Sequence, residues 1–330
     1  MEDKTVTLTT KPGASLHISV LHPQPHRQNP LSNTLLVFLN GLALPSAAWS
    51  EAIDHLVEVR KEHKQPLPAV LCYDRYGQGR SDSDPTDAQD SPYGHDLRAA
   101  VADLHQLLTQ VSHDELHHRP VDELRIVLVC NSIGCPLARL YAAEHPGLVE
   151  AYLFLDSMMA NTDFVSLFPD PDDAEFDGSQ LPEGVSADDL RHARDTFGKH
   201  FHPAVPNAEH LDRRRLGELL PRADGPELPD GPGGRSPLLV VVGHDWDVFA
   251  EQSEKGSLSV PKAVINAYMN PTWEAYNEGL ARLVRTGCEV KIAKGCGHFI
   301  QKDDPAFVAR EISDILNELQ SRSGQKVHQK

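Results

Sequence analysis

Short apolar runs alternate with segments patterned for amphipathic helices, and this alternation constrains the fold more than any other feature of the chain. Apolar runs of strand length lie at 35–39, 70–73, 126–130, 152–155, 238–242 and 290–293. Helical spacing of apolar residues marks 46–64, 97–111, 135–144, 273–285 and 307–319. Strands separated by single helices build a parallel sheet with helices on both faces. A hairpin at 5–9 and 15–21, turned by Pro12-Gly13, precedes them.

One long segment, residues 161–236, interrupts the alternation between two of the apolar runs. It holds most of a dense acidic cluster and a Pro/Gly-rich exit. Ser186 is placed to cap a helix reaching His200, and a second helix is expected at 208–220. Apolar residues favour a packed helical lid over a disordered acidic loop: Phe164, Leu167, Phe168, Phe197 and Phe201. The sequence therefore predicts an α/β fold, a mostly parallel sheet with a lid insertion, whose core comprises 1–160 and 237–330.

The charge balance narrows the range of partners. Asp and Glu number 48 against 31 Lys and Arg, so the formal charge is −17, which disfavours binding to nucleic acid or to anionic membranes. The N-terminus shows no signal-peptide pattern, and no apolar run reaches the length of a membrane span. Five cysteines, an odd number without a CxxC pair, indicate buried free thiols in a reducing compartment. We expect a cytoplasmic protein that acts on a small molecule, and the oligomeric state stays open.

Neither a metal nor a cofactor is expected. The nearest approach to a metal cluster is His113, His117 and His118 beside Asp114 and Glu115, in a polar connection that we interpret as solvated surface. The chain contains no phosphate loop and no cofactor motif. A reaction that needs only water as co-substrate, such as hydrolysis, fits these absences.

The most informative motif lies in residues 126–135, IVLVCNSIGC. An apolar strand ends, Ser132 occupies the turn and a helix begins at once. This is the pattern of a nucleophile elbow, in which the residues two before and two after the serine must be small because strand and helix nearly touch. Cys130 and Gly134 hold those places, with Cys130 in place of the usual glycine. The free N–H groups at the start of the helix suit an oxyanion. A serine that merely caps a helix is the structural alternative.

Three further motifs decide between these interpretations, because together with the elbow they resemble the α/β-hydrolase superfamily over nearly the whole chain. Asn40-Gly41-Leu42 stands where that family has its His-Gly oxyanion loop, with Asn in place of His. Residues 74–81, DRYGQGRS, are similar to the family's D-x-x-G-x-G-x-S turn. Residues 295–300, GCGHFI, followed by Asp304-Pro305, resemble the loop of its catalytic histidine.

The resemblance implies a mechanism with Ser132 as nucleophile and His298 as base. His298 would take the serine proton during attack and return it to the leaving group, and water would then cleave the acyl-serine. The backbone N–H groups of Leu42 and Ile133 would form the oxyanion hole. A serine nucleophile, rather than an aspartate, argues against haloalkane dehalogenase or epoxide hydrolase chemistry.

The acid that orients His298 has three candidates. The family usually places it after the strand at 238–242, where Asp245 and Asp247 lie; if His244 replaces the usual glycine there, Asp247 takes the acid position. A minority, including fungal zearalenone-degrading lactone hydrolases, carries the acid one strand earlier, where this chain has Asp156. Residues 273–280 resemble a branch that often lacks the later aspartate. We therefore favour Asp156, with Asp247 as the main alternative.

The sequence restricts the substrate only loosely. The negative charge disfavours strongly anionic substrates, so we expect a medium-sized, largely uncharged ester or lactone. Two alternatives remain open: a carbon–carbon bond hydrolase with the same triad, and a non-catalytic binding member of the fold. The residues that could line the pocket are Gly41, Trp246, Phe249, Tyr268, Trp273 and Phe299.

Overall fold

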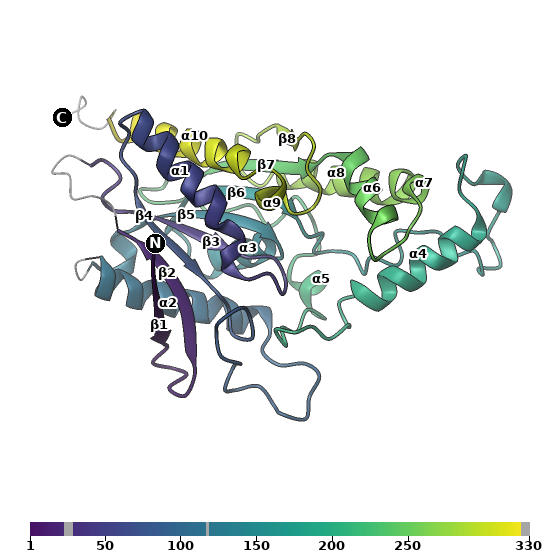
Figure 1. Cartoon of the computed structure of the whole chain (residues 1–330), viewed down its shortest axis with the longest axis horizontal. Helices are drawn as coiled ribbons and strands as arrows, with labels where there is room; N and C mark the ends of the chain where they lie inside the picture. The colour runs from purple at the N-terminus through teal and green to yellow at the C-terminus, as the bar shows by residue number, and fades with distance from the viewer. Residues whose placement is uncertain (23–28, 117–118, 325–330) are drawn as a thin grey trace.

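Eight strands form one sheet at the centre of the computed structural model, which describes residues 1–22, 29–116 and 119–324 (Figure 1). Their order across the sheet is β1-β2-β4-β3-β5-β6-β7-β8. From β3 onward all neighbouring strands run parallel, whereas β2 pairs antiparallel with β1 and β4. The strands are β1 (Glu2–Thr7), β2 (Ser15–Leu21), β3 (Thr34–Leu39), β4 (Ala69–Tyr73), β5 (Arg125–Ser132), β6 (Val149–Ser157), β7 (Leu238–His244) and β8 (Val290–Ala293). The predicted mostly parallel sheet is confirmed.

Helices cover both faces of the sheet because alternate strand residues point to opposite sides. On β3, Leu36 and Phe38 pack toward α1 (Ser50–Glu62) and α10 (Pro305–Gly324), whereas Leu35 and Val37 belong to the core under α2 (Leu97–Glu115) and α3 (Gly134–Glu144). Helix α1 lies beside α10 in Figure 1. This arrangement brings the carboxyl ends of β3, β5, β6 and β7 to one edge of the sheet, where ligands bind in folds of this class.

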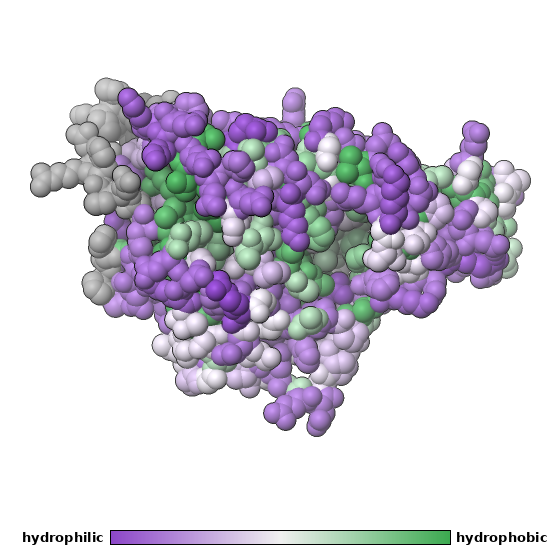
Figure 2. Space-filling view, viewed as in Figure 1, coloured by the Kyte–Doolittle hydropathy of each residue, from purple (hydrophilic) through white to green (hydrophobic). Residues whose placement is uncertain are grey.

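Residues 161–236 form an insertion between β6 and β7, with its longest helix, α4 (Ala187–His200), projecting from the body (Figure 1). The predicted start of α4 is confirmed: the Ser186 hydroxyl accepts from the Asp189 N–H, and the Asp189 carboxylate accepts from the Ser186 N–H. Leu190 and Phe197 of α4 are buried. The view in Figure 2 shows a predominantly hydrophilic surface broken by apolar patches, in keeping with the acidic composition.

The prediction of a helix at 208–220 is wrong, since only α5 (Leu216–Leu219) is helical there. The Asn207 side chain accepts hydrogen bonds from the N–H groups of Glu209 and Leu211, which replaces helical bonding with a local turn. His210 in this turn has a positive φ of 58°. The sequence prediction also missed α6 (Trp246–Lys255) directly after β7.

The remaining helices complete the C-terminal part of the fold. A bent helical segment runs through α7 (Lys262–Val264), a π-helical turn at Ile265–Met269 and α8 (Asn270–Leu280), and α9 (Ile300–Asp303) precedes α10. Within the described ranges no helix is both long enough and apolar enough to cross a bilayer. All five cysteines lie in those ranges and are free thiols; Cys288 is half-buried and the other four are buried.

Candidate functional site

Ser132 occupies a sharp turn between a buried strand and a buried helix. Strand β5 ends at Ser132 and helix α3 begins at Gly134. The φ of Ser132 is 54°, a left-handed conformation that a non-glycine residue adopts only when its surroundings impose it. A Cβ on Gly134 would collide with the carbonyl oxygen of Leu39, so the close approach of helix and strand requires glycine there. The local geometry expected of a nucleophile elbow is present.

Asp156 lies near the end of β6, the strand beside β5, and its side chain is fully buried. Its Oδ2 accepts a hydrogen bond from His298 Nδ1 at 2.6 Å. Its Oδ1 lies 2.8 Å from His244 Nδ1. Burial alone would raise the pKa of this carboxyl, but the charge of His244 and the hydrogen bonds from both imidazoles outweigh it and lower the pKa. Asp156 is therefore a buried carboxylate shared between two histidines.

His298 is held in place by the residue that precedes the serine. The amide of Asn131 donates to the carbonyl oxygens of His298, at 3.1 Å, and Leu155, at 3.0 Å, and it accepts from Gln301 Nε2 at 3.1 Å. These contacts tie the histidine loop to the ends of β5 and β6. With Nδ1 donating to Asp156, Nε2 is the ring nitrogen left to take a proton.

The two later aspartates are not placed to act on His298. The side chain of Asp247 is 79% exposed and forms an ion pair with Lys262 at 2.8 Å. Asp245 caps α6, since its carboxylate accepts from the N–H of Asp247 and also from that of Gly295, both at 3.2 Å. Of the three candidate acids, the structure brings only Asp156 into contact with the imidazole.

The loop after β3 lies against the serine. A Cβ built on Gly41 would be 3.5 Å from Ser132 Cβ, so the loop that carries Leu42 passes close to the Ser132 side chain. Ile133 is buried at the start of α3. In the described part of the chain no acceptor is hydrogen-bonded to the backbone N–H of Leu42 or of Ile133. Both predicted oxyanion donors therefore have no hydrogen-bond acceptor among the described residues.

Asn40 fixes the base of this loop rather than facing the site. Its Oδ1 accepts from Trp49 Nε1 at 2.8 Å, and its Nδ2 donates to the carbonyl of Tyr73 and to Gln78 Oε1, at 2.8 and 2.9 Å. The asparagine that stands in the place of a histidine therefore ties the loop to the turn after β4.

A buried acid from the insertion holds the tip of the same loop. Glu209, 1% exposed, forms an ion pair with Arg75 at 3.0 Å and accepts from Gln78 Nε2 at 2.9 Å. It also accepts from the N–H of Ala43, whose φ is 51°. Arg75 and Gln78 in turn donate to the carbonyl of Gly41, at 3.0 and 2.9 Å. This Glu209 network orients the peptides on either side of Leu42.

Replacing Glu209 with leucine is expected to lower turnover by roughly 10- to 100-fold, because a misaligned oxyanion donor weakens transition-state stabilisation. It should also destabilise the fold by about 3 kcal/mol, since the guanidinium of Arg75 stays buried without its partner. Thermal denaturation and steady-state kinetics on the folded fraction measure both effects. Glu218→Leu, in an exposed pair with Arg215, is the matched control and should change neither. Equal rates for the two variants would rule out a role for Glu209 in the site.

Aromatic rings surround the exposed edge of His298. The ring of Trp273 lies 5.4 Å from the imidazole, and its Nε1 donates to the Ser157 carbonyl at 2.8 Å. Phe299 is 40% exposed, and its ring lies 5.0 Å from the imidazole. Trp246 is half-buried and is not among the rings packed on His298 in the described residues. Trp273, Phe299 and Gly41 thus border the site, and the backbone carbonyl of Trp246 accepts a hydrogen bond from Asn270 Nδ2 at 3.2 Å.

Four residues at or beside the site are not predicted by the sequence: Asn131, Glu209, His244 and Asn270, whose Oδ1 lies 3.0 Å from His244 Nε2. Asn131 could have been found, since a polar residue inside an apolar run next to the serine must satisfy its amide. His244 was considered only as a replacement for a loop glycine. Glu209 and Asn270 gave no signal because their partners are distant in sequence.

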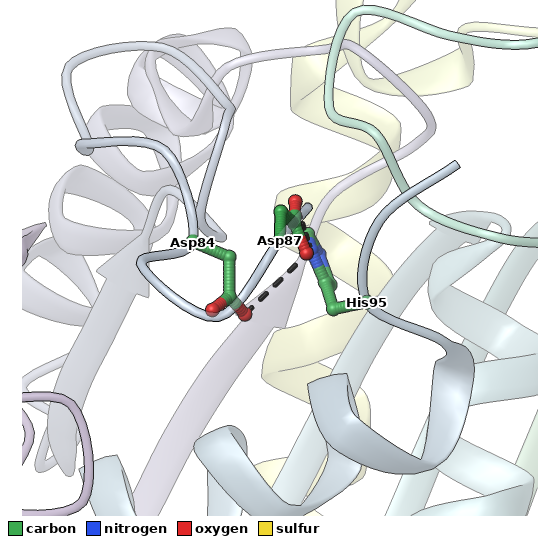
Figure 3. A group of neighbouring side chains, drawn as sticks. All are labelled: Asp84, Asp87 and His95. Carbon is green, nitrogen blue, oxygen red and sulfur yellow. Dashed lines mark hydrogen bonds and ion pairs between the residues drawn. The ribbon is translucent and has the colours of Figure 1, made fainter. Parts of the chain in front are cut away.

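A separate acidic group, Asp84, Asp87 and His95, places its ligand-type atoms within 4.8 Å of one another (Figure 3). His95 Nδ1 lies 3.2 Å from Asp87 Oδ2. The ammonium of Lys11 forms ion pairs with Asp84 and, at 2.6 Å, with Asp103. The buried Lys11 ammonium thus compensates Asp84, whereas Asp87 faces His95, and the Lys11–Asp103 pair ties the first hairpin turn to α2. Of the histidines near 113, His117 and His118 lie outside the described residues, and His113 is exposed beside Asp114.

Replacing Lys11 with methionine is expected to lower the free energy of unfolding by about 3 kcal/mol or more, because Asp103 would remain buried without its lysine and Asp84 would keep only His95, at 3.6 Å. Denaturant titration measures the change. Lys199→Met removes a lysine from an exposed i,i+4 pair with Asp195 and should cost less than about 1 kcal/mol. If Lys11→Met lowered the free energy of unfolding no more than Lys199→Met does, the buried carboxylates would have to be neutral.

Comparisons with known proteins agree with this geometry. A model described as the alpha/beta hydrolase family matches residues 36–311. The search of curated proteins gave no match. Among solved structures, epoxide hydrolase I of potato (Solanum tuberosum) is 16% identical, with a TM-score of 0.56 over 96% of this chain and 99% of that one. A proline iminopeptidase of Mycobacterium smegmatis is 15% identical, with a TM-score of 0.52 over 98% of this chain and 100% of that one.

An epoxide hydrolase mutant from Vigna radiata is 15% identical, with a TM-score of 0.55 over 96% of this chain and 98% of that one. At these identities the likeness concerns the fold. It shows that the sheet and its flanking helices have the same arrangement in proteins that are named for different reactions. The chemistry of this chain must therefore be argued from its own residues.

Proposed function

The chain belongs to the alpha/beta hydrolase family, and from that premise we propose that it is a serine hydrolase that cleaves a carboxylic ester or lactone through an acyl-serine. The observation that carries the proposal is the 2.6 Å contact between His298 Nδ1 and Asp156 at the sheet edge where the strained Ser132 turn lies. A serine, a histidine and a buried acid are the parts that nucleophilic acyl transfer requires.

In this mechanism Ser132 Oγ attacks the carbonyl carbon of the substrate while its proton passes to His298 Nε2. The Asp156 carboxylate fixes the tautomer of His298 and stabilises the imidazolium that forms. The N–H groups of Ile133 and Leu42 bind the oxyanion of the tetrahedral intermediate. The imidazolium then gives its proton to the leaving alkoxide, and a water molecule activated by His298 hydrolyses the acyl-serine.

A serine nucleophile favours acyl transfer over the epoxide opening for which the epoxide hydrolases of similar fold are named. A serine needs a base to remove its proton, and Ser132 is in the same sheet-edge cluster as His298. Acyl transfer also needs two oxyanion donors, and the backbone of Leu42 and Ile133 offers them. Both features suit a substrate with a carbonyl group rather than an epoxide ring.

We further propose that the substrate is of medium size and largely uncharged. The formal charge of −17 disfavours anionic substrates, and Trp273 and Phe299 offer apolar surface next to His298. The insertion, residues 161–236, would act as a lid over this surface, with Glu209 fixing its base. The position of the acid on β6 is the feature shared with lactone hydrolases of the zearalenone-degrading type, which places aromatic lactones among the first substrates to test.

A substrate panel tests the proposed function. Purified protein is assayed with short-chain and medium-chain p-nitrophenyl esters, an aromatic macrolactone, a β-diketone and styrene oxide. Ester or lactone turnover without epoxide opening is expected. Cleavage of the diketone alone would assign a carbon–carbon bond hydrolase, and binding without turnover of any of them would assign a non-catalytic member of the fold.

A further inference from the structure

The buried imidazole of His244 contacts the Asp156 oxygen that His298 does not use. His244 ends β7 and is 3% exposed. Its Nδ1 lies 2.8 Å from Asp156 Oδ1, and its backbone N–H donates to the same oxygen at 3.2 Å. The carboxylate is thus bound on one side by His244 and on the other by His298. The acceptors around the ring decide which nitrogens of His244 carry protons.

Asn270 at the start of α8 determines the protonation of His244 Nε2. Its Nδ2 donates to the carbonyl oxygen of Trp246 at 3.2 Å and to Asn266 Oδ1 at 2.7 Å. A backbone carbonyl can only accept, so the orientation of the Asn270 amide is fixed. Its Oδ1 therefore faces His244 Nε2, at 3.0 Å, as an acceptor.

Both ring nitrogens of His244 consequently face acceptors, a carboxylate oxygen and an amide oxygen. A neutral imidazole has one N–H and would leave one of these pairs with two lone pairs facing each other in a buried place. Only the imidazolium satisfies both contacts. Two aromatic rings support the cation, since the centroids of Phe249 and Trp273 lie 4.3 and 5.2 Å from that of the His244 ring.

We propose that His244 is an imidazolium that positions Asp156 and offsets its negative charge toward His298, an inference that rests on the proposed role of Asp156 as the triad acid. The two donors of His244 fix Oδ1, which leaves Oδ2 aimed at His298. Three charged or titratable groups surround His244. Asp156 comes from β6 and Asp245 is the next residue along the chain. His298 contacts the other oxygen of the Asp156 carboxylate.

The balance of charge around His244 favours the same protonation state. Burial of the ring opposes the cation, but the charge of Asp156 and the hydrogen bonds to Asp156 and Asn270 outweigh it, with a smaller contribution from Asp245. Together they raise the pKa of His244 above its ordinary value.

The positive charge of His244 changes how readily His298 accepts a proton. With His244 charged, the group of His244, Asp156 and a neutral His298 has no net charge at rest and becomes positive when His298 accepts the serine proton. Without the charge of His244, the same proton transfer would neutralise a lone buried carboxylate and be more favourable. His244 thus keeps His298 unprotonated, and able to act as a base, down to lower pH.

Nuclear magnetic resonance of protein carrying 15N-labelled histidine tests the protonation state directly. At pH 8 we expect two ring N–H correlations from His244, assigned by their loss in His244→Asn. Asparagine keeps a donor near the position of Nδ1 but has no charge. A single ring N–H from His244 at this pH would overturn the proposal, and this measurement does not depend on any hydrolytic activity.

The pH dependence of kcat/KM tests the effect on the triad. In His244→Asn the acidic limb of the profile should move to higher pH by roughly one unit, because the positive charge of His244 no longer disfavours the imidazolium of His298. A residue that only supported the fold would lower the rate at every pH and leave the limb in place, and that result would also overturn the proposal. Asn270→Asp, which keeps an acceptor at Nε2, should retain both ring N–H signals. If Ser132 proved not to be the nucleophile, the resonance result would still stand.

Discussion

Replacing Ser132 with alanine is expected to reduce turnover by roughly 10⁴-fold or more and to abolish labelling by a fluorophosphonate probe. Without the hydroxyl no acyl-enzyme forms, and only binding and the oxyanion donors remain to assist attack by water. The probe reacts with an activated serine, so peptide mapping of the labelled protein should place the adduct on Ser132.

The same variant should fold as well as the parent protein. The φ of Ser132 is 54°, and alanine must adopt the same strained conformation. Circular dichroism and a thermal melt check that the loss of rate is not a loss of fold. A variant that kept half of its esterase rate would mean that another residue is the nucleophile, and labelling of a second peptide would identify it.

Replacing Asp156 with asparagine is expected to lower turnover by roughly 10³- to 10⁴-fold, in line with the loss of the acid in other serine triads. The hydrogen-bond donors around the carboxylate would fix the orientation of the new amide. Two donors of His244 converge on one oxygen, so the amide oxygen of asparagine would turn to them and its NH₂ would face His298 Nδ1. His298 would then carry its proton on Nε2, where it cannot accept one from Ser132.

Asp247→Asn and Asp245→Asn are the matched controls and should retain most of the activity, because neither side chain contacts His298. Asp156→Asn should also lose stability, since it leaves the buried charge of His244 without a counter-ion, at a cost of about 3 kcal/mol or more. Kinetics must therefore be measured where the variant is fully folded. An inactive Asp247→Asn beside a nearly normal Asp156→Asn would transfer the role of the acid to Asp247.

The parts of the fold that depend on local pattern could be predicted from the sequence. The strand–serine–helix run placed Ser132 at the end of β5, and the six apolar runs correspond to β3 through β8. The resemblance to a branch with its acid one strand after the serine favours Asp156, and in the structure the Asp156 carboxylate contacts His298. In each case the signal lies within one element or in the order of the elements along the chain.

The parts that depend on distant partners could not be predicted in this way. The turn at 207–211 gave a helical pattern because its apolar and acidic residues match an amphipathic helix, yet Asn207 and Glu209 use their side chains for other bonds. His244 gave no sign of its role, since its two acceptors lie on β6 and α8. A single buried histidine has many structural uses, and only the positions of its neighbours distinguish them.

The Glu209 network limits how freely the insertion of this chain could be exchanged. In many enzymes a segment inserted between two strands behaves as an exchangeable module, so that swapping it changes the substrate and leaves the reaction intact. Here the insertion supplies the acid that binds Arg75 and the Ala43 N–H beneath the oxyanion loop. A chimaera that received a foreign insertion would lose the support of its own reaction centre. A replacement insertion would therefore need its own acid at the position of Glu209 to hold Arg75, Gln78 and the Ala43 N–H.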